Sequence, residues 1–258
     1  MYGCLLAGNP VKEFISAVKN NSIMMVEFLA IMVALVIVSV IVQKIIMKRN
    51  GDNSKIFNTR AVALIGIFGA IAGVLMALEF PVFFIPTDFK MEFGDLAALI
   101  AGFAYGPAAA VFVEIIKEFV KLLIRPTSTA FVGEVGNFCI GCMFVLPATI
   151  FYWMKKTKKR AIASAVIGWL CMIFAGAVVN RFFLVPSLVK MFIGGDYNAL
   201  FEGAAKFNPL ITDINSYVLF TSVPINILKG GADTLIVILI YKPLSPYLKG
   251  TNKKKVKG

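Results

Sequence analysis

The 258-residue chain contains no histidine. Imidazole is the side chain used most often as a general base, proton relay or metal ligand near neutral pH, so its absence removes the commonest form of each. Four cysteines are present, and Cys139 and Cys142 have the spacing C-x-x-C. This pair lies in an apolar, helix-like run without a second pair, which favours close helix packing over redox or metal chemistry. We expect no metal site and no catalytic residue.

Charged residues are also scarce, at 16% of the chain, whereas 59% of the residues are hydrophobic and the mean hydropathy is +0.84. An ordinary soluble domain is only about 45–50% apolar. The composition therefore predicts an all-α integral membrane protein. At about 20 apolar residues per span, the length suffices for six or seven helices with short loops. It leaves no room for a separate soluble enzyme domain.

The net charge of +12 is concentrated beside the apolar runs. Sixteen of the 26 lysines and arginines lie in the segments 44–60, 155–160 and 242–257. Basic residues clustered at helix ends mark cytoplasmic loops and are attracted to the anionic inner leaflet. The charge therefore predicts a topology in the cell membrane, with the C-terminus inside, rather than binding to nucleic acid.

Seven apolar segments are expected to span the membrane. They cover residues 23–47, 61–78, 96–105, 107–125, 135–154, 161–185 and 217–241. Pro81 and Pro86 exclude a regular helix from the loop at 80–95. With the basic segments inside, the N-terminus and the loops at 80–95, 126–134 and 194–214 all lie outside. These three loops would cover a pocket that opens outward.

The segment after Pro107 carries five charged side chains on one helical face, because they follow the spacing i, i+3, i+4, i+7 and i+11. They are Glu114, Lys117, Glu118, Lys121 and Arg125. Opposite charges on this face can neutralise one another and point into the bundle. We favour internal ion pairs over a transport relay.

Small residues recur at spacings of four in the segment 61–78. They are Gly66 with Ala70, and Gly69 with Gly73 and Ala77. Such spacing places small side chains on one helical face and lets another helix approach closely. That helix could belong to this protein or to a separate subunit, and the residues alone leave both alternatives open.

Asn180, Asn226 and Lys229 interrupt apolar spans. An ammonium group within the hydrocarbon costs about 2.5 kcal/mol or more, so an intramembrane lysine is by default a hypothesis about function. A buried amide needs partners for its oxygen and its nitrogen, and a buried lysine needs an acceptor or an anion. Interhelical hydrogen bonds would satisfy these groups, and so would a bound molecule with carbonyls and ring nitrogens.

Four segments together are more specific than any of these features. They are FPVFFIPTDFKMEFGDLAALIAGFAYGP (80–107), EIIKEFVKLLIRPTSTAFVGEVGNF (114–138), NRFFLVP (180–186) and VPINILKG (223–230). In this order they resemble the substrate-binding (S) subunits of energy-coupling-factor (ECF) vitamin transporters, and among these the riboflavin-specific subunits. The resemblance covers about three quarters of the chain, from residue 59 to residue 248.

The resemblance implies a six-helix substrate-binding domain at 59–248. An N-terminal extension at 1–58, with one extra transmembrane helix, and a basic tail at 249–258 would flank it. Such a subunit binds riboflavin with high affinity at the outer face and delivers it with a transmembrane coupling (T) subunit and two ATPases. The chain fits this dependence because it lacks the GxxxxGK[ST] phosphate loop. The small-residue face, at Gly66, Ala70, Gly73 and Ala77, would meet the coupling subunit.

The same resemblance implies a ligand site. Asn180, Asn226 and Lys229 would hydrogen-bond the polar edge of the isoalloxazine ring, and Lys90 belongs to the motif of the first loop. The ring would stack on Phe83, Phe84 and Phe89, and the ribityl hydroxyls would contact Asp88, Thr127 and Asn137. Riboflavin would be cargo rather than a cofactor, with flavin mononucleotide as a second candidate. An extra acid near the mouth, Glu134, would slightly disfavour the phosphorylated form.

Three alternatives remain at this level. The first is an S subunit for a different vitamin. The second is an intramembrane enzyme that uses the charges between Glu114 and Arg125, which lacks a recognisable pair of nucleophile and base. The third is a secondary transporter that works without a coupling subunit, for which the sequence shows no internal repeat.

Overall fold

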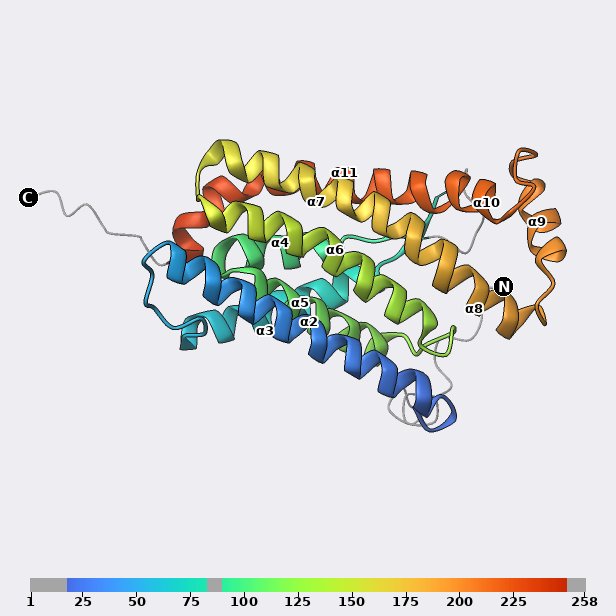
Figure 1. The fold of residues 1–258 in the computed structure, drawn as a ribbon, viewed down its shortest axis with the longest axis horizontal. Helices are drawn as coiled ribbons and strands as arrows, with labels where there is room; N and C mark the ends of the chain where they lie inside the picture. The colour runs from blue at the N-terminus through green and yellow to red at the C-terminus, as the bar shows by residue number, and fades with distance from the viewer. Residues whose placement is uncertain (1–17, 83–89, 250–258) are drawn as a thin grey trace, which may run out of the picture.

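A computed structural model describes residues 18–82 and 90–249, with side chains up to residue 241. The described part is a bundle of helices with one two-residue strand pair, β1 (Phe80–Pro81) and β2 (Lys90–Met91) (Figure 1). The helices are α2 (Ser22–Arg49), α3 (Thr59–Ala77), α4 (Gly94–Tyr105), α5 (Pro107–Ile124), α6 (Val132–Met154), α7 (Lys158–Val179), α8 (Val185–Phe192), α9 (Tyr197–Ala205), α10 (Ile214–Phe220) and α11 (Ser222–Lys249). A π-helix, η1 (Asn180–Leu184), joins α7 to α8.

Five helical runs are long and apolar enough to cross a membrane. They are α2, α3, α6, the continuous run Lys158–Phe192 and the run Ile214–Tyr241. The shorter helix α4 and the charged helix α5 complete the seven predicted segments. All seven predicted segments are therefore confirmed as helices, and most of the predicted ends lie within three residues of the observed ones.

The sixth segment continues to Phe192, seven residues beyond its predicted end at residue 185. Pro186 is the second residue of α8 and follows the π-helix η1 closely. The last segment starts earlier than predicted, because Asp213 caps α10 and accepts a hydrogen bond from the backbone N–H of Ser216 at 2.7 Å. Hydrogen bonds from Ser216 also hold the pKa of Asp213 below its usual value.

The two ends of the bundle differ as predicted. The strand pair, the 126–131 loop and the 193–213 segment with α9 gather at one end, and the links between α2 and α3 and between α6 and α7 lie at the other (Figure 1). At this second end, the side-chain amide of Asn50 donates a hydrogen bond to the carbonyl of Trp153 at 3.1 Å. The basic residues after α2 thus lie beside those after α6.

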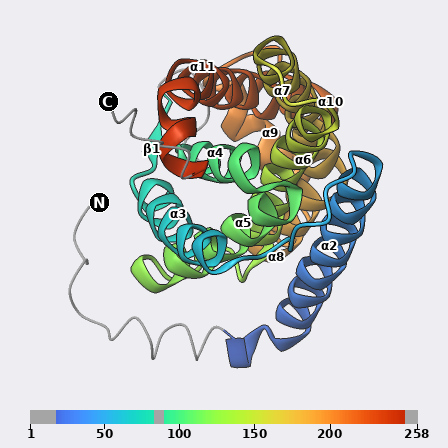
Figure 2. The same ribbon diagram turned by 90° about the vertical axis from the view of Figure 1, so that its left-hand side faces the viewer.

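Helix α4 occupies the centre of the bundle, and α3, α5, α6 and α11 pack around it (Figure 2). Small residues make this position possible, since Ala97, Ala98, Ala101 and Gly102 are all buried. At Gly102 a Cβ atom would lie 2.8 Å from the Cβ of Ala110 on α5. Because α4 contacts four other helices, the residues at its first turn can reach several of them.

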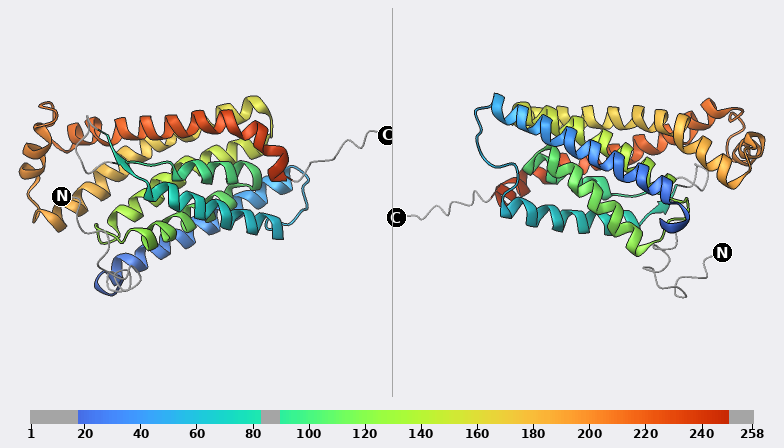
Figure 3. Two further views of the ribbon diagram at one scale, coloured as in Figure 1. Left: turned by 180° about the vertical axis from the view of Figure 1, so that it is seen from behind. Right: turned by 60° about the horizontal axis from the view of Figure 1, so that its bottom comes forward.

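Helix α2 lies along the outside of this bundle, against α5 and α6 (Figure 3). The rings of Phe28 and Phe138 meet edge to face with centroids 5.8 Å apart. Farther along, the Gln43 side chain donates to the carbonyl of Tyr105 at 3.0 Å and accepts from the N–H of Ala108 at 2.9 Å. The extra transmembrane helix predicted from the sequence is therefore packed on the bundle and bonded to the turn between α4 and α5.

The small-residue stripe of α3 divides between two faces. Gly73 is buried against α5, where a Cβ atom would collide with the side chain of Val120. Ala77 is also buried, whereas Gly66 and Ala70 are exposed on the outside. The prediction of a partner surface is thus corrected for Gly73 and Ala77, which are used inside the protein, and stays a prediction for Gly66 and Ala70.

Candidate ligand-binding site

A cavity of about 540 Å³ opens among α6, η1, α8 and α11 at the end where the predicted outer loops gather. This volume falls within the range of about 300–1,000 Å³ that is usual for small-molecule sites. Much of the lining is apolar, with contributions from Met76, Ile140, Leu184, Leu188 and Ile225. The cavity can therefore enclose a flat apolar body and offer it polar groups at a few positions.

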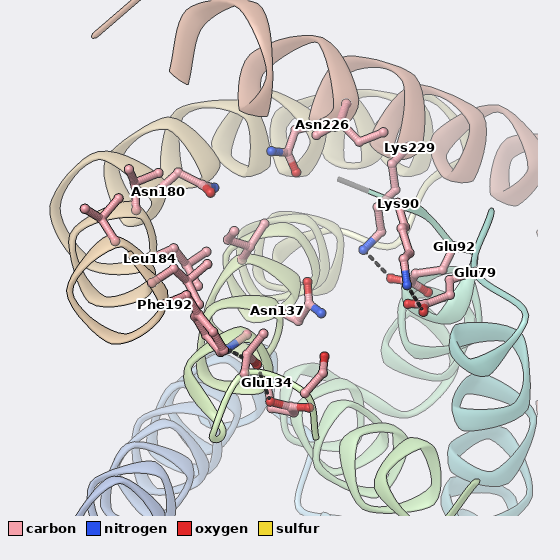
Figure 4. A pocket seen from close by; sticks show the side chains of 18 of the residues that line it. Glu79, Lys90, Glu92, Glu134, Asn137, Asn180, Leu184, Phe192, Asn226 and Lys229 are labelled. Atoms are coloured by element: carbon pink, nitrogen blue, oxygen red, sulfur yellow. Dashed lines mark hydrogen bonds and ion pairs between the residues drawn. The ribbon is translucent and has the colours of Figure 1, made fainter. Parts of the chain in front are cut away.

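Five of the predicted site residues line this one cavity (Figure 4). They are Lys90, Asn137, Asn180, Asn226 and Lys229. They come from β2, α6, η1 and α11, so the fold brings together positions that span 140 residues of sequence. Asn180 and Asn226 are only 4% and 5% exposed, and what exposure they have faces the cavity.

Ser222 holds the amides of Asn180 and Asn226 in place. The Asn180 amide nitrogen donates to the Ser222 hydroxyl at 2.9 Å and to the Gly176 carbonyl at 2.8 Å. The Asn226 amide nitrogen donates to the Ser222 carbonyl at 2.8 Å and to its hydroxyl at 3.3 Å. These bonds use both protons of each amide, so the two oxygens are the groups left to accept hydrogen bonds from a ligand.

The local backbone explains how these two amides come together. Asn180 begins the π-helix, and its carbonyl accepts the N–H of Val185, five residues later. A π turn is wider than an α turn and is frequently found at functional sites. On the neighbouring turn, Gly176 lacks the Cβ atom that would collide with the amide of Asn226. The glycine thus allows α7 and α11 to approach closely at the site.

Lys229 is paired in the structure rather than left alone in the membrane interior. Its ammonium group contacts the carboxylate of Glu92 and lies 2.8 Å from Oδ2 of Asp95. Three N–H donors are available on an ammonium group, and two of them face these carboxylates. The third can serve a ligand acceptor in the cavity. Glu92 and Asp95 lie in the quoted segment 80–107, but nothing in the sequence indicates that they pair with Lys229.

Below the cavity the charges continue into α5. The second oxygen of Asp95 binds Lys117, which also lies 2.5 Å from the carboxylate of Glu114. All three side chains are fully buried. On α6, Gly141 provides the space for this layer, because a Cβ atom there would lie 2.6 Å from the Glu114 carboxylate. Gly141 is part of the C-x-x-C segment, for which close packing was predicted.

The charged face of α5 does point into the bundle, as predicted. Its cations pair mostly with carboxylates on other elements, rather than with neighbours on the same helix. Besides the pairs of Lys117, Lys121 contacts Glu134 of α6 at 2.7 Å, and Arg125 contacts Glu79 at 2.9 Å. The internal ion pairs are therefore confirmed, and they connect α5 to its neighbours.

The acid Glu134 forms part of the cavity wall. Besides its contact with Lys121, it accepts hydrogen bonds from the hydroxyls of Thr127 at 3.0 Å and Thr129 at 3.2 Å. Thr127, predicted to contact a ribityl chain, turns to Glu134 and is not among the lining residues, whereas Ser128 and Thr129 are. In the structure Thr127 therefore helps to hold Glu134, and its contact with a ligand stays a prediction.

Two more acids, Glu79 on the cavity wall and Asp233 near Lys229 on α11, were not predicted from the sequence. Glu79 lines the cavity and contacts Lys90 at 2.5 Å. This contact depends on the pairing of β1 with β2, which brings Lys90 close to Glu79 and which the sequence alone does not show. Asp233 is fully buried one turn after Lys229. Asp233 follows Lys229 by four residues in an apolar helix, so the sequence does indicate that the two side chains share one helical face.

Four predicted ligand contacts lie outside the described residues. They are Phe83, Phe84, Asp88 and Phe89. The segment 83–89 connects β1 to β2, and Lys90 at its end lines the cavity. The stacking and ribityl contacts assigned to these four residues stay predictions.

Known proteins match the part of the chain that contains the cavity. The family model for the ECF transporter, substrate-specific component, matches residues 60–241. The riboflavin transporter RibU of Staphylococcus aureus (strain TCH60) is 31% identical over 185 residues, which cover 72% of this chain and 90% of that protein. The riboflavin transporter FmnP of Bacillus subtilis (strain 168) is 28% identical over 191 residues, covering 74% and 94%.

A solved structure gives the same result for the fold. It is described as the structure and mechanism of the S component of a bacterial ECF transporter, and it superposes with a TM-score of 0.56 at 28% sequence identity. The match covers 73% of this chain and 97% of that structure. The family match begins at residue 60, so α2 precedes it.

Proposed function

The chain belongs to the family of substrate-specific components of ECF transporters, and we propose that it binds riboflavin in the cavity among α6, η1, α8 and α11. Members of this family are transport proteins of the membrane, so the multi-pass bundle carries a substrate rather than converting one. The observation that carries the proposal is the convergence of Asn180, Asn226 and Lys229 on this single cavity.

The polar groups of the site complement the polar edge of an isoalloxazine ring. That edge carries one N–H between two carbonyl groups, so it needs an acceptor between donors. The oxygen of Asn180 or of Asn226 can accept from that N–H, and the remaining proton of Lys229 can donate to one of the carbonyls. Asn137 makes no hydrogen bond to another described residue and can offer both functions to the ligand.

The apolar walls suit the faces of the same ring. Ile140, Leu184 and Ile225 line the cavity and can cover an aromatic surface. A flat ring buried among aliphatic side chains gains from desolvation, and the polar edge fixes its orientation. The two relatives named riboflavin transporters support this ligand over other vitamins.

The distribution of charge supports an orientation in the cell membrane. The basic residues after α2 and α6 lie at one end, so this end and the C-terminus face the cytoplasm under the positive-inside rule. The cavity then opens to the outside. Riboflavin is captured there and handed over with the ECF coupling subunit and two ATPases as partners.

The first test is a titration of purified protein with riboflavin, followed by the quenching of flavin fluorescence. Asn226→Ala removes one acceptor, and Asn198→Ala on the exposed part of α9 is the matched control. We expect saturable quenching by wild type and by Asn198→Ala, and at least a tenfold weaker affinity for Asn226→Ala. One good hydrogen bond of this kind corresponds to about 1.4 kcal/mol.

Two results would overturn the proposal. Folded wild-type protein that fails to quench riboflavin fluorescence would exclude this ligand. Binding of folate, pantothenate or thiamine with higher affinity than riboflavin would assign the chain to another vitamin, with the family unchanged.

A further inference from the structure

Every ammonium group that lines the cavity is already paired with a carboxylate that lines the same cavity. This statement covers the described residues, and segment 83–89 adds no lysine or arginine. The pairs are Lys90 with Glu79, Lys121 with Glu134, and Lys229 with Glu92. An anionic group entering the cavity would thus find no unpaired cation on its lining.

Glu134 is the most tightly held of these acids. It is 2% exposed, and three donors converge on its carboxylate: the Lys121 ammonium and the hydroxyls of Thr127 and Thr129. It also lies in the first turn of α6, where the helix dipole favours negative charge. A cation, two hydroxyls and a helix N-terminus would together suit a phosphate, but the protein's own carboxylate occupies the position.

The position of Glu134 relative to the proposed ligand contacts gives this arrangement a consequence. Glu134 lies across the cavity from Asn226, with Asn137 between them (Figure 4). A flavin whose ring edge contacts Asn226 and Lys229 would extend its side chain away from these residues. A phosphate at the end of that side chain would come close to the carboxylate of Glu134.

We infer that Glu134 is a specificity-determining residue that makes the site select riboflavin over a flavin with a terminal phosphate. The inference rests on the proposed function, and it adds which form of the vitamin the site accepts. Like charges brought together in a partly dehydrated cavity repel each other more strongly than in water. The phosphate would therefore have to displace Glu134 from Lys121 or remain without a counter-charge.

The test compares two affinities in each variant. Riboflavin and flavin mononucleotide are titrated against wild type, Glu134→Gln and Glu202→Gln, an exposed acid on α9 that serves as the control. We expect wild type and Glu202→Gln to bind riboflavin at least tenfold more tightly than flavin mononucleotide. Glu134→Gln keeps an oxygen for Lys121 but loses the charge, so we expect the ratio of the two affinities to shrink about tenfold.

A second measurement needs no variant. The terminal phosphate has a second pKa near about 6, so it carries less negative charge at pH 5 than at pH 7.5. We expect the preference of wild type for riboflavin to narrow at pH 5, with riboflavin titrated alongside as the internal control. A preference that does not change with pH would contradict the repulsion.

The outcomes separate the two claims. Equal affinities of wild type for both flavins, or an unchanged ratio in folded Glu134→Gln, would overturn the role of Glu134 and leave riboflavin binding intact. Wild-type protein that binds neither flavin would overturn the proposed function itself.

Discussion

Lys117 of α5 and Lys229 of α11 bind the two oxygens of one carboxylate, that of Asp95 at the start of α4. Through this acid the wall of the cavity is joined to the buried charges of α5. The backbone of Lys117 in turn meets α3, since a Cβ atom on Gly73 would lie 3.1 Å from the carbonyl of Lys117. Three helices and the ligand site thus depend on one side chain.

Replacement of Asp95 should therefore destabilise the folded protein. Asp95→Asn removes the shared counter-charge from two buried ammonium groups, and breaking a buried pair in this way costs about 3–5 kcal/mol. For a protein of this size we expect the midpoint of thermal unfolding in detergent to fall by roughly 6–20 °C. Riboflavin affinity should fall as well, because Lys229 would keep Glu92 as its single carboxylate partner at the cavity.

The control for this experiment is Asp52→Asn in the exposed link after α2, which should unfold like wild type. If Asp95→Asn kept the wild-type unfolding midpoint, the contacts of the Asp95 carboxylate with Lys117 and Lys229 would not stabilise the fold.

Gly176 leads to a prediction that depends only on a steric contact. A methyl group at this position would collide with the amide of Asn226, so Gly176→Ala should push the amide away from the cavity. We expect riboflavin affinity to fall at least tenfold while the protein still folds. Gly203→Ala on α9 is the matched control, since no atom lies within 4 Å of the added methyl group. Unchanged affinity for Gly176→Ala would place the ligand away from Asn226.

The sequence predicted the site where the relevant spacing lies within one helix. Asn226 and Lys229 are three residues apart, so their shared face follows from the helical period. The acids that hold Lys229 are more than 130 residues earlier in the sequence, and their contact depends on α4 lying at the centre of the bundle. A single sequence contains no signal for that placement.

The same limit applies to the partners of α3 and α5. Spacing of four identified the small residues of α3 but not the helix they would face, and α5 turned out to cover Gly73. On α5, helical spacing predicted pairs along one face. In the structure Lys121 instead forms an ion pair with Glu134 of α6, because the Glu134 carboxylate lies within reach of the Lys121 ammonium group. Patterns along one helix predict its faces, whereas the partners of those faces depend on packing.

The exposed part of the α3 stripe leads to a prediction about assembly. Gly66 and Ala70 face outward, and no atom lies within 4 Å of a Cβ added at Gly66. If the coupling subunit packs there, Ala70→Leu should weaken co-purification of the transporter complex at least tenfold. Riboflavin binding by the isolated protein should not change, because the residue is remote from the cavity lining.

Ala163→Leu on the exposed face of α7 adds the same bulk elsewhere and should leave assembly intact. Normal assembly of the Ala70 variant would assign the coupling subunit to another surface.

The final prediction concerns α2, which precedes the family match. Gln43 is buried and makes both of its hydrogen bonds to the turn between α4 and α5. Gln43→Leu keeps the size but leaves the Tyr105 carbonyl and the Ala108 N–H without this partner, and each such group costs about 1–3 kcal/mol. We expect a fall of several degrees in the unfolding midpoint, with Ile41→Leu on the exposed face of α2 as the control. Because only a docked helix can make these bonds, an unchanged midpoint would mean that the two hydrogen bonds do not stabilise the packing of α2 on the bundle. The expected fall would make it a seventh helix of the folded domain.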